Sequence, residues 1–193
     1  MTQVSISALV AGAISGQLVS FPTDTVPALA VQPHHSELIF AAKQRSQDKP
    51  LILMGASLES LFPYVTGTPE EFEIWRQIAQ KYWPGALTLV VPASEKVPAA
   101  MNPTDPTTIG LRVPASDIAI AILSQTGPLA TTSANRSGQP PLETMAEIDA
   151  AFPDVLTLHP SEFPMIKPIS TGVPSTVAKW TGTNWNILRQ GGV

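Results

Sequence analysis

The stretch PEEFEIWRQIAQKYWPGALTLVV, residues 69–91, joins the clearest helix in this sequence to its clearest strand. Thr68 can cap the helix, Pro69 suits its first turn, and two following glutamates favour the positive end of the helix dipole. The apolar side chains that share one face of this helix are Phe72, Trp75, Ile78 and Tyr82. Trp-Pro-Gly then ends the helix, and the apolar run at 86–91 predicts a strand.

The same two patterns continue in both directions from this stretch. Apolar residues at helical spacing predict further helices over 6–14, 36–44, 117–126 and 144–152. Short apolar runs predict further strands at 18–21, 51–54, 108–113, 128–132, 155–159, 175–180 and 185–189. This order of elements predicts one α/β (α+β) domain over residues 1–193, with a twisted mixed parallel and antiparallel sheet flanked by helices. The Pro-rich segment 92–107 is expected to form a long surface loop.

Composition excludes several classes of protein. The 193 residues are 44% hydrophobic and 13% charged, and a chain of this length buries a sizeable core without disulfides. Cysteine is absent, which excludes thiolate zinc sites, Fe–S clusters and cysteine nucleophiles. Eleven cations against fifteen acids give a net charge of −4, which argues against a broad surface for nucleic acid or anionic membrane. No apolar run is long enough for a membrane span, and we expect a cytoplasmic protein.

The usual signatures of phosphate-binding and hydrolytic enzymes are also missing. Neither G-x-x-x-x-G-K-[ST] nor G-x-G-x-x-G occurs, and there is no G-x-S-x-G. The three histidines, His34, His35 and His159, lack metal-ligand spacing. An ordinary hydrolase or metalloenzyme is therefore disfavoured.

Polar clusters instead follow or precede the predicted strands. Six of the eleven cations lie in these clusters, namely Lys43, Arg45, Lys49, Arg112, Arg136 and Arg189. Each cation alone is more typical of a solvated surface. Because ligands of open α/β sheets bind beyond strand ends, the clusters together predict one crevice for an anionic substrate. Arg offers a planar fork and Lys a point charge for carboxylate or phosphate, while hydroxyls supply neutral hydrogen bonds.

Seven segments in this order resemble the blocks of a known family. They are PTDTV (22–26), KQRSQDKPL (43–51), YWPGALTLVV (82–91), TIGLRVP (108–114), PLATTSANRSG (128–138), PSTVAKW (174–180) and ILRQGG (187–192). Together they resemble the YrdC/Sua5 family of threonylcarbamoyl-AMP synthases, in its short single-domain bacterial form. The resemblance implies a YrdC-like fold with a concave, locally basic cavity.

The resemblance also implies a reaction. Members of the family are nucleotidyltransferases that make threonylcarbamoyl-AMP and pyrophosphate from L-threonine, bicarbonate or CO2, and ATP with Mg²⁺. Partner proteins then transfer the threonylcarbamoyl group to adenosine 37 of tRNA. Such chemistry requires positioning and electrostatic stabilisation, with no protein nucleophile and no metal ligand from the chain.

Site residues follow from the matching positions. The resemblance implies that threonine or its carbamate contacts Thr25, Arg112, Ser133 and Ser175. It implies that ATP contacts Lys43, Arg45, Lys49, Thr108, Asn135 and Arg189. Asp24 is interpreted as a turn and hydrogen-bond organiser.

The sequence departs from the family pattern on the amino-acid side. Pro27-Ala28-Leu29-Ala30 stands where the family usually has Tyr-Gly-Leu-Gly, and Met54 aligns with a frequent His. Two alternatives to the synthase are a paralogue that uses another small substrate with ATP, and a non-catalytic protein that binds tRNA or double-stranded RNA.

Overall fold

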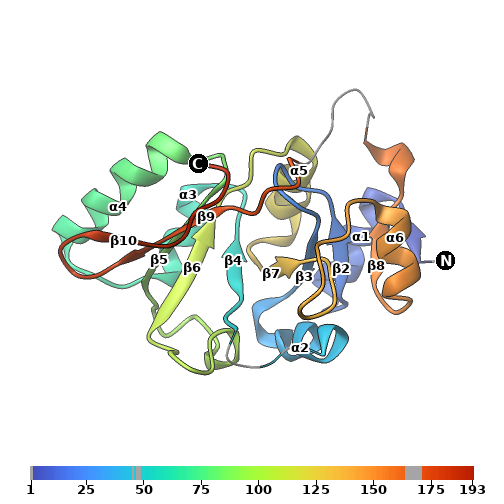
Figure 1. Ribbon diagram of the computed structural model, residues 1–193, viewed down its shortest axis with the longest axis horizontal. Helices are drawn as coiled ribbons and strands as arrows, with labels where there is room; N and C mark the ends of the chain where they lie inside the picture. The colour runs from blue at the N-terminus through green and yellow to red at the C-terminus, as the bar shows by residue number, and fades with distance from the viewer. Residues whose placement is uncertain (1, 45, 47–48, 164–170) are drawn as a thin grey trace.

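The computed structural model describes residues 2–44, 46, 49–163 and 171–193, and within them ten strands form one sheet (Figure 1). In chain order the strands are β1 (Gln3–Val4), β2 (Val19–Phe21), β3 (Ala28–Val31), β4 (Ile52–Met54), β5 (Leu87–Pro92), β6 (Thr108–Arg112), β7 (Leu129–Ser133), β8 (Leu156–Leu158), β9 (Thr176–Trp180) and β10 (Trp185–Arg189). Across the sheet their order is β1-β8-β2-β3-β7-β4-β6-β5-β9-β10. Parallel and antiparallel neighbours both occur, which confirms the predicted mixed sheet.

Six α-helices lie around this sheet in the described part of the chain. They are α1 (Ile6–Ile14), α2 (Glu37–Lys43), α3 (Leu58–Leu61), α4 (Pro69–Tyr82), α5 (Asp117–Thr126) and α6 (Met145–Ala151). Figure 1 shows α4 beside β5 and β10 at one end of the sheet, and α1 and α6 beside β8 at the other. None of the helices in the described residues is long and apolar enough to cross a membrane.

The α4–β5 unit forms as its sequence predicts. The Thr68 hydroxyl accepts from the Glu71 amide at 3.2 Å, and the Glu71 carboxylate accepts from the Thr68 amide at 3.0 Å, so the helix begins with a capping box. Trp75 and Ala79 are the buried residues of the helix. The other Glu71 oxygen accepts from the Trp180 indole at 2.8 Å, which joins α4 to β9.

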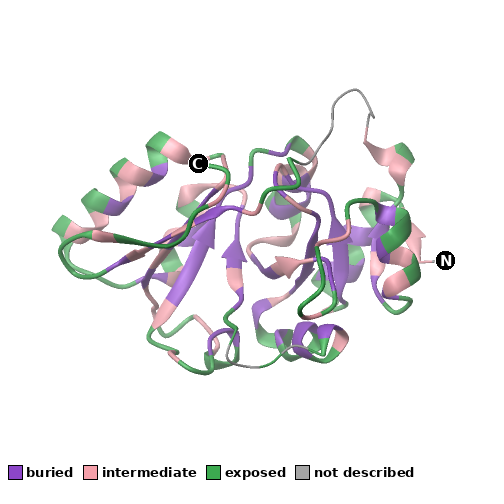
Figure 2. Cartoon of the chain, viewed as in Figure 1, coloured by how far each residue is buried: buried purple, intermediate pink, exposed green. Residues whose placement is uncertain are grey.

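Several parts of the fold differ from expectation. The short strand β1 and the short helix α3 were not predicted. β3, a four-residue ALAV segment between β2 and β7, was not predicted because alanine favours strands weakly and Pro27 precedes it. Its residues are nonetheless all buried, and Figure 2 shows burial concentrated on the central strands. The 92–107 segment is a long connection but does not lie wholly on the surface, since Met101 is fully buried and its carbonyl accepts from the Leu51 amide.

Candidate functional site

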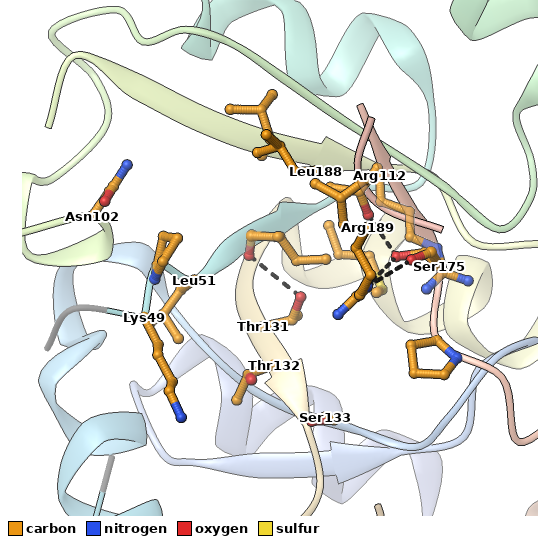
Figure 3. Close-up of a pocket in the computed structure, with 18 of the residues that line it drawn as sticks. Lys49, Leu51, Asn102, Arg112, Thr131, Thr132, Ser133, Ser175, Leu188 and Arg189 are labelled. Carbon is orange, nitrogen blue, oxygen red and sulfur yellow. Dashed lines mark hydrogen bonds between the residues drawn. The ribbon is translucent and has the colours of Figure 1, made fainter. Parts of the chain in front are cut away.

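A cavity of about 560 Å³ lies over one face of the sheet between β3 and β10 (Figure 3). Because side chains alternate along a strand, every second residue of the central strands forms its floor. These floor residues are Ile52 and Met54 of β4, Thr88 and Val90 of β5, Thr108, Gly110 and Arg112 of β6, and Val177 and Lys179 of β9. Thr131, Thr132 and Ser133 of β7, the strand between β3 and β4, form one wall of the cavity.

Arg112 is held rigidly at the end of β6. Its Nη2 lies 2.6 Å from a carboxylate oxygen of Asp24, its Nη1 donates to the Thr25 hydroxyl at 2.7 Å, and its Nε donates to the Gly85 carbonyl at 3.0 Å. The residue is only 3% exposed. Burial lowers the pKa of Arg112, the Asp24 carboxylate raises it, and the charge of Arg189 lowers it. An arginine stays protonated under such shifts, so Asp24 balances a permanent buried charge.

Arg189 approaches the same cavity from β10. Its Nε and Nη2 donate to the Ser175 carbonyl at 3.1 and 2.8 Å, and Nη2 also lies 3.3 Å from the Ser175 hydroxyl. That hydroxyl lies 2.8 Å from the hydroxyl of Thr88 on the floor. Partial desolvation lowers the pKa of Arg189, yet the side chain remains accessible from the cavity. Two guanidinium groups therefore serve one cavity.

Lys43 lies behind the β7 wall. Its Nζ donates to the Ser133 carbonyl and, at 3.1 Å, to the side-chain oxygen of Asn135. The Ser133 hydroxyl donates to the same Asn135 oxygen at 2.6 Å. Lys43 is 1% exposed, so this cluster supports Ser133 from behind and holds its hydroxyl in place.

The structure brings most of the predicted site residues together. Those that line the cavity are Thr25, Lys49, Thr108, Arg112, Ser133, Ser175 and Arg189. Lys43 and Asn135 do not line it but contact Ser133, which does. Arg45 lies outside the described residues.

Arg136, which the sequence placed with the other crevice cations, does not line the cavity. Its guanidinium donates to the Ala151 carbonyl at 3.1 Å and lies over the Phe152 ring. Arg136 therefore packs against the C-terminal end of α6 instead of facing the cavity.

Several residues that line the cavity were not predicted from the sequence. Lys179 lies 3.4 Å from the carboxylate of Asp105, which accepts from the Thr108 hydroxyl at 3.2 Å, and Asn102 donates to that hydroxyl at 3.1 Å. Period-two alternation from Ser175 would have placed Lys179 on the cavity face. Asn102 and Asp105 belong to a loop and carried no such signal.

The departures from the family pattern also reach the cavity. Ala28 and Met54 line it, and Met54 pairs with Arg112 in the β4–β6 register. Pro27 contributes its carbonyl, which accepts from the Ala134 amide at 2.9 Å. Of the altered positions, Met54 therefore lies beside Arg112 in the sheet, and Ala28 lines the same cavity.

The arrangement suits an anionic ligand. Within the described residues, no group of three or more His, Cys, Asp or Glu side chains is arranged to hold a metal ion. The cavity offers guanidinium, ammonium and hydroxyl groups, which bind carboxylate and phosphate oxygens and position them without forming a covalent bond.

Comparison with known proteins supports the family resemblance seen in the sequence. The Sua5/YciO/YrdC family model, described as telomere recombination, matches residues 13–191. The chain is 42% identical over 129 residues to the threonylcarbamoyl-AMP synthase of Pyrococcus abyssi, covering 65% of this chain and 37% of that protein. It is 32% identical over 186 residues to a putative threonylcarbamoyl-AMP synthase of Mycobacterium tuberculosis, covering 94% and 82%.

Solved structures agree with the sequence relatives. The P. abyssi Sua5 structure complexed with L-threonine superposes with a TM-score of 0.82 at 34% identity, covering 97% of this chain and 54% of that one. Escherichia coli YciO, at 23% identity and a TM-score of 0.78, shares the fold and is covered to 88%. The chain thus spans about half the length of the archaeal structure. From the match over residues 13–191, the chain belongs to the Sua5/YciO/YrdC family.

Proposed function

We propose that this protein makes threonylcarbamoyl-AMP and pyrophosphate from L-threonine, bicarbonate or CO2, and ATP. The observation that carries the proposal is the convergence of Arg112 and Arg189 on one hydroxyl-lined cavity. Relatives named as threonylcarbamoyl-AMP synthases support it, as does a relative's structure described as complexed with L-threonine.

Arg112 is the proposed partner of the threonine carboxylate. Three of its five N–H groups donate to described residues, so two remain for a ligand. Asp24 and Thr25 fix the plane of the guanidinium, which orients the carboxylate before reaction. Ser133 and Ser175 supply further hydrogen bonds for threonine or its carbamate.

Arg189 is the proposed partner of the ATP phosphates. Its Nη1 has no hydrogen bond to the residues that the structure describes, and the side chain lines the cavity. Lys49 and Thr108 line the same cavity and are proposed to add charge and a hydroxyl. Lys43 and Asn135 act through Ser133.

These contacts suit the proposed reaction. The threonine amine adds to CO2 and loses a proton, and the resulting carbamate oxygen attacks the α-phosphorus of ATP. The new O–P bond forms as the bond to the β-phosphate oxygen breaks, and pyrophosphate leaves. No protein atom is bonded at any point, so the chain's residues position two anions and stabilise the charge that develops on the phosphates.

Mg²⁺ is proposed to enter with ATP. Its ligands would be phosphate oxygens of ATP and water. When bound, the ion would neutralise phosphate charge. Transfer of the product to tRNA by partner proteins belongs to the same proposal.

A turnover assay tests the proposal. Pyrophosphate release from Mg-ATP should require both L-threonine and bicarbonate. Arg112→Ala should raise the KM for threonine, and Arg189→Ala should weaken ATP binding more. Arg76→Ala is the control, because Arg76 lies on α4 over the Phe62 ring and outside the cavity lining. Folded protein that releases no pyrophosphate with threonine would refute the proposal.

A second candidate is the same chemistry on another small amino or carbamoyl substrate. Ala28 and Met54 favour it, because both line the cavity and Met54 is the register partner of Arg112. Pyrophosphate release measured across a panel of amino acids separates the two candidates: preference for an amino acid other than threonine selects the second. RNA binding that falls steeply with salt, without turnover, would instead select the RNA-binding alternative.

A further inference from the structure

β10 contains a bulge beside the cavity. Asn186 pairs with Lys179 and Ile187 with Ala178 of β9, but the next pair joins Arg189 to Val177. Two residues of β10 therefore advance against one of β9, and Leu188 is the extra residue.

The bulge brings two consecutive side chains to one face. In a regular strand, Leu188 and Arg189 would point to opposite faces of the sheet. Here both line the cavity together with Val177, and Figure 3 shows them side by side at the wall opposite Thr131 and Thr132. Ile187 pairs with Ala178, a residue of the core on the other face, and does not line the cavity.

Leu188 belongs to an apolar part of the lining. Ile52, Val90 and Val177 also line the cavity, around a flat position at Gly110. Gly110 pairs with Ile52 on one side and Val90 on the other, and a Cβ there would lie 2.9 Å from the Ile52 methyl Cγ2. A glycine inside a strand marks a place where another group can approach the backbone closely. A planar apolar group can therefore lie over this floor.

Leu188 itself is 55% exposed without a ligand. A leucine in this position gains by covering its apolar surface. Threonine and bicarbonate offer little apolar surface, whereas the purine ring of ATP has two broad apolar faces.

We infer that Leu188 packs against the base of ATP, so that the bulge supplies a base contact and a phosphate contact from consecutive residues. The inference rests on the ATP half of the proposed function. Leu188 touches the face of the ring and not its edge, so it contributes to affinity for purine nucleotides in general.

The test compares two neighbouring leucine-sized side chains. Leu188→Ala should weaken Mg-ATP binding by roughly tenfold, since it removes most of one buried apolar side chain. Ile187→Ala, which is 51% exposed on the same strand but outside the cavity lining, should leave ATP binding unchanged. Leu188→Met should retain most of the affinity because it keeps an apolar contact of similar size.

Magnesium tripolyphosphate is the second probe, because it has the phosphates of ATP without the base. Titration calorimetry should show equal affinity for it in wild type and Leu188→Ala, and GTP should lose as much as ATP. The inference is overturned if Leu188→Ala binds ATP like Ile187→Ala, or if it loses tripolyphosphate equally. Wild-type protein that binds ATP but shows no threonine-dependent turnover would refute the proposed reaction and leave this inference standing. Wild-type protein that does not bind ATP would overturn both.

Discussion

The Asp24 carboxylate lies 2.6 Å from the Arg112 guanidinium, and the side chains are 16% and 4% exposed respectively. Removing the charge of Asp24 leaves Arg112 buried without a counter-ion. We expect Asp24→Asn to lower the free energy of unfolding by about 3 kcal/mol. Denaturant titration measures this value. Glu73→Gln, which removes an exposed 3.9 Å pair with Arg76 on α4, is the control and should change it by less than about 0.5 kcal/mol. Equal effects of the two variants would contradict the assigned role of Asp24.

Gly110 keeps the centre of the cavity floor flat. Gly110→Ala would place a methyl group 2.9 Å from Ile52 Cγ2 and 3.3 Å from Thr88 Cγ2, so we expect destabilisation by about 1–3 kcal/mol and weaker ATP binding. Adding Ile52→Ala makes room for the new methyl group. Thermal unfolding and ATP titration of the double variant should show partial recovery compared with Gly110→Ala, and no recovery would place the clash elsewhere.

Lys43 holds the β7 wall from behind. Lys43→Met keeps the apolar stem but removes the donors to the Ser133 carbonyl and the Asn135 oxygen, so we expect a loss of about 1–3 kcal/mol in stability. Because the Ser133 hydroxyl loses its fixed position, kcat/KM for the synthase reaction should fall as well. Lys96→Met, at an exposed site outside the cavity lining, is the matched control. A stable Lys43→Met variant with unchanged turnover would show that the cluster has no part in the site.

Asp149 links the first residues of the described chain to α6. Hydrogen bonds from the Thr2 hydroxyl and from the Thr2 amide, at 2.5 and 2.8 Å, lower the pKa of Asp149. A folded-state pKa below the unfolded value of about 3.9 means that this carboxylate stabilises the fold above that pH. The contribution is lost as pH falls through the folded-state pKa.

Asp149→Asn should therefore be less stable than wild type at neutral pH, and the difference should shrink below about pH 4. Denaturant midpoints measured from neutral to acid pH provide the test. Asp154→Asn, at an exposed position in the turn that follows α6, is the matched control for the substitution itself. A gap for Asp149→Asn that stayed constant with pH would mean that packing, not charge, holds Thr2.

Local signals decided which parts of the fold were predictable. α4 and α5 have the predicted bounds because caps and a helix-breaking Trp-Pro-Gly or Gly mark their ends. β3 was missed because its pairing with β2 and β7, not the propensity of its alanines, makes it a strand.

The site residues likewise include some that could be placed from the sequence and others that could not. Arg112 and Ser175 could be placed from strand positions, but whether a cation faces the cavity depends on tertiary packing. Lys43 turned out to lie behind the wall and Arg136 on α6, because helix ends and turns set those directions. The bulge at Leu188 was unpredictable for the same reason: its register exists only once β9 and β10 are paired.

The order of strands across the sheet has a consequence for synthesis on the ribosome. β10 pairs with β9, which pairs with β5, so the cavity wall that carries Arg189 is the last to be made. A nascent chain that has emerged only as far as β8 already has Arg112 and the β7 hydroxyls, yet lacks Ser175, Leu188 and Arg189. Under the proposed binding mode, such a chain holds Lys49 and Thr108 but lacks the Leu188 and Arg189 contacts, so full protection of the nascent chain by ATP should begin only after residue 189 has left the exit tunnel.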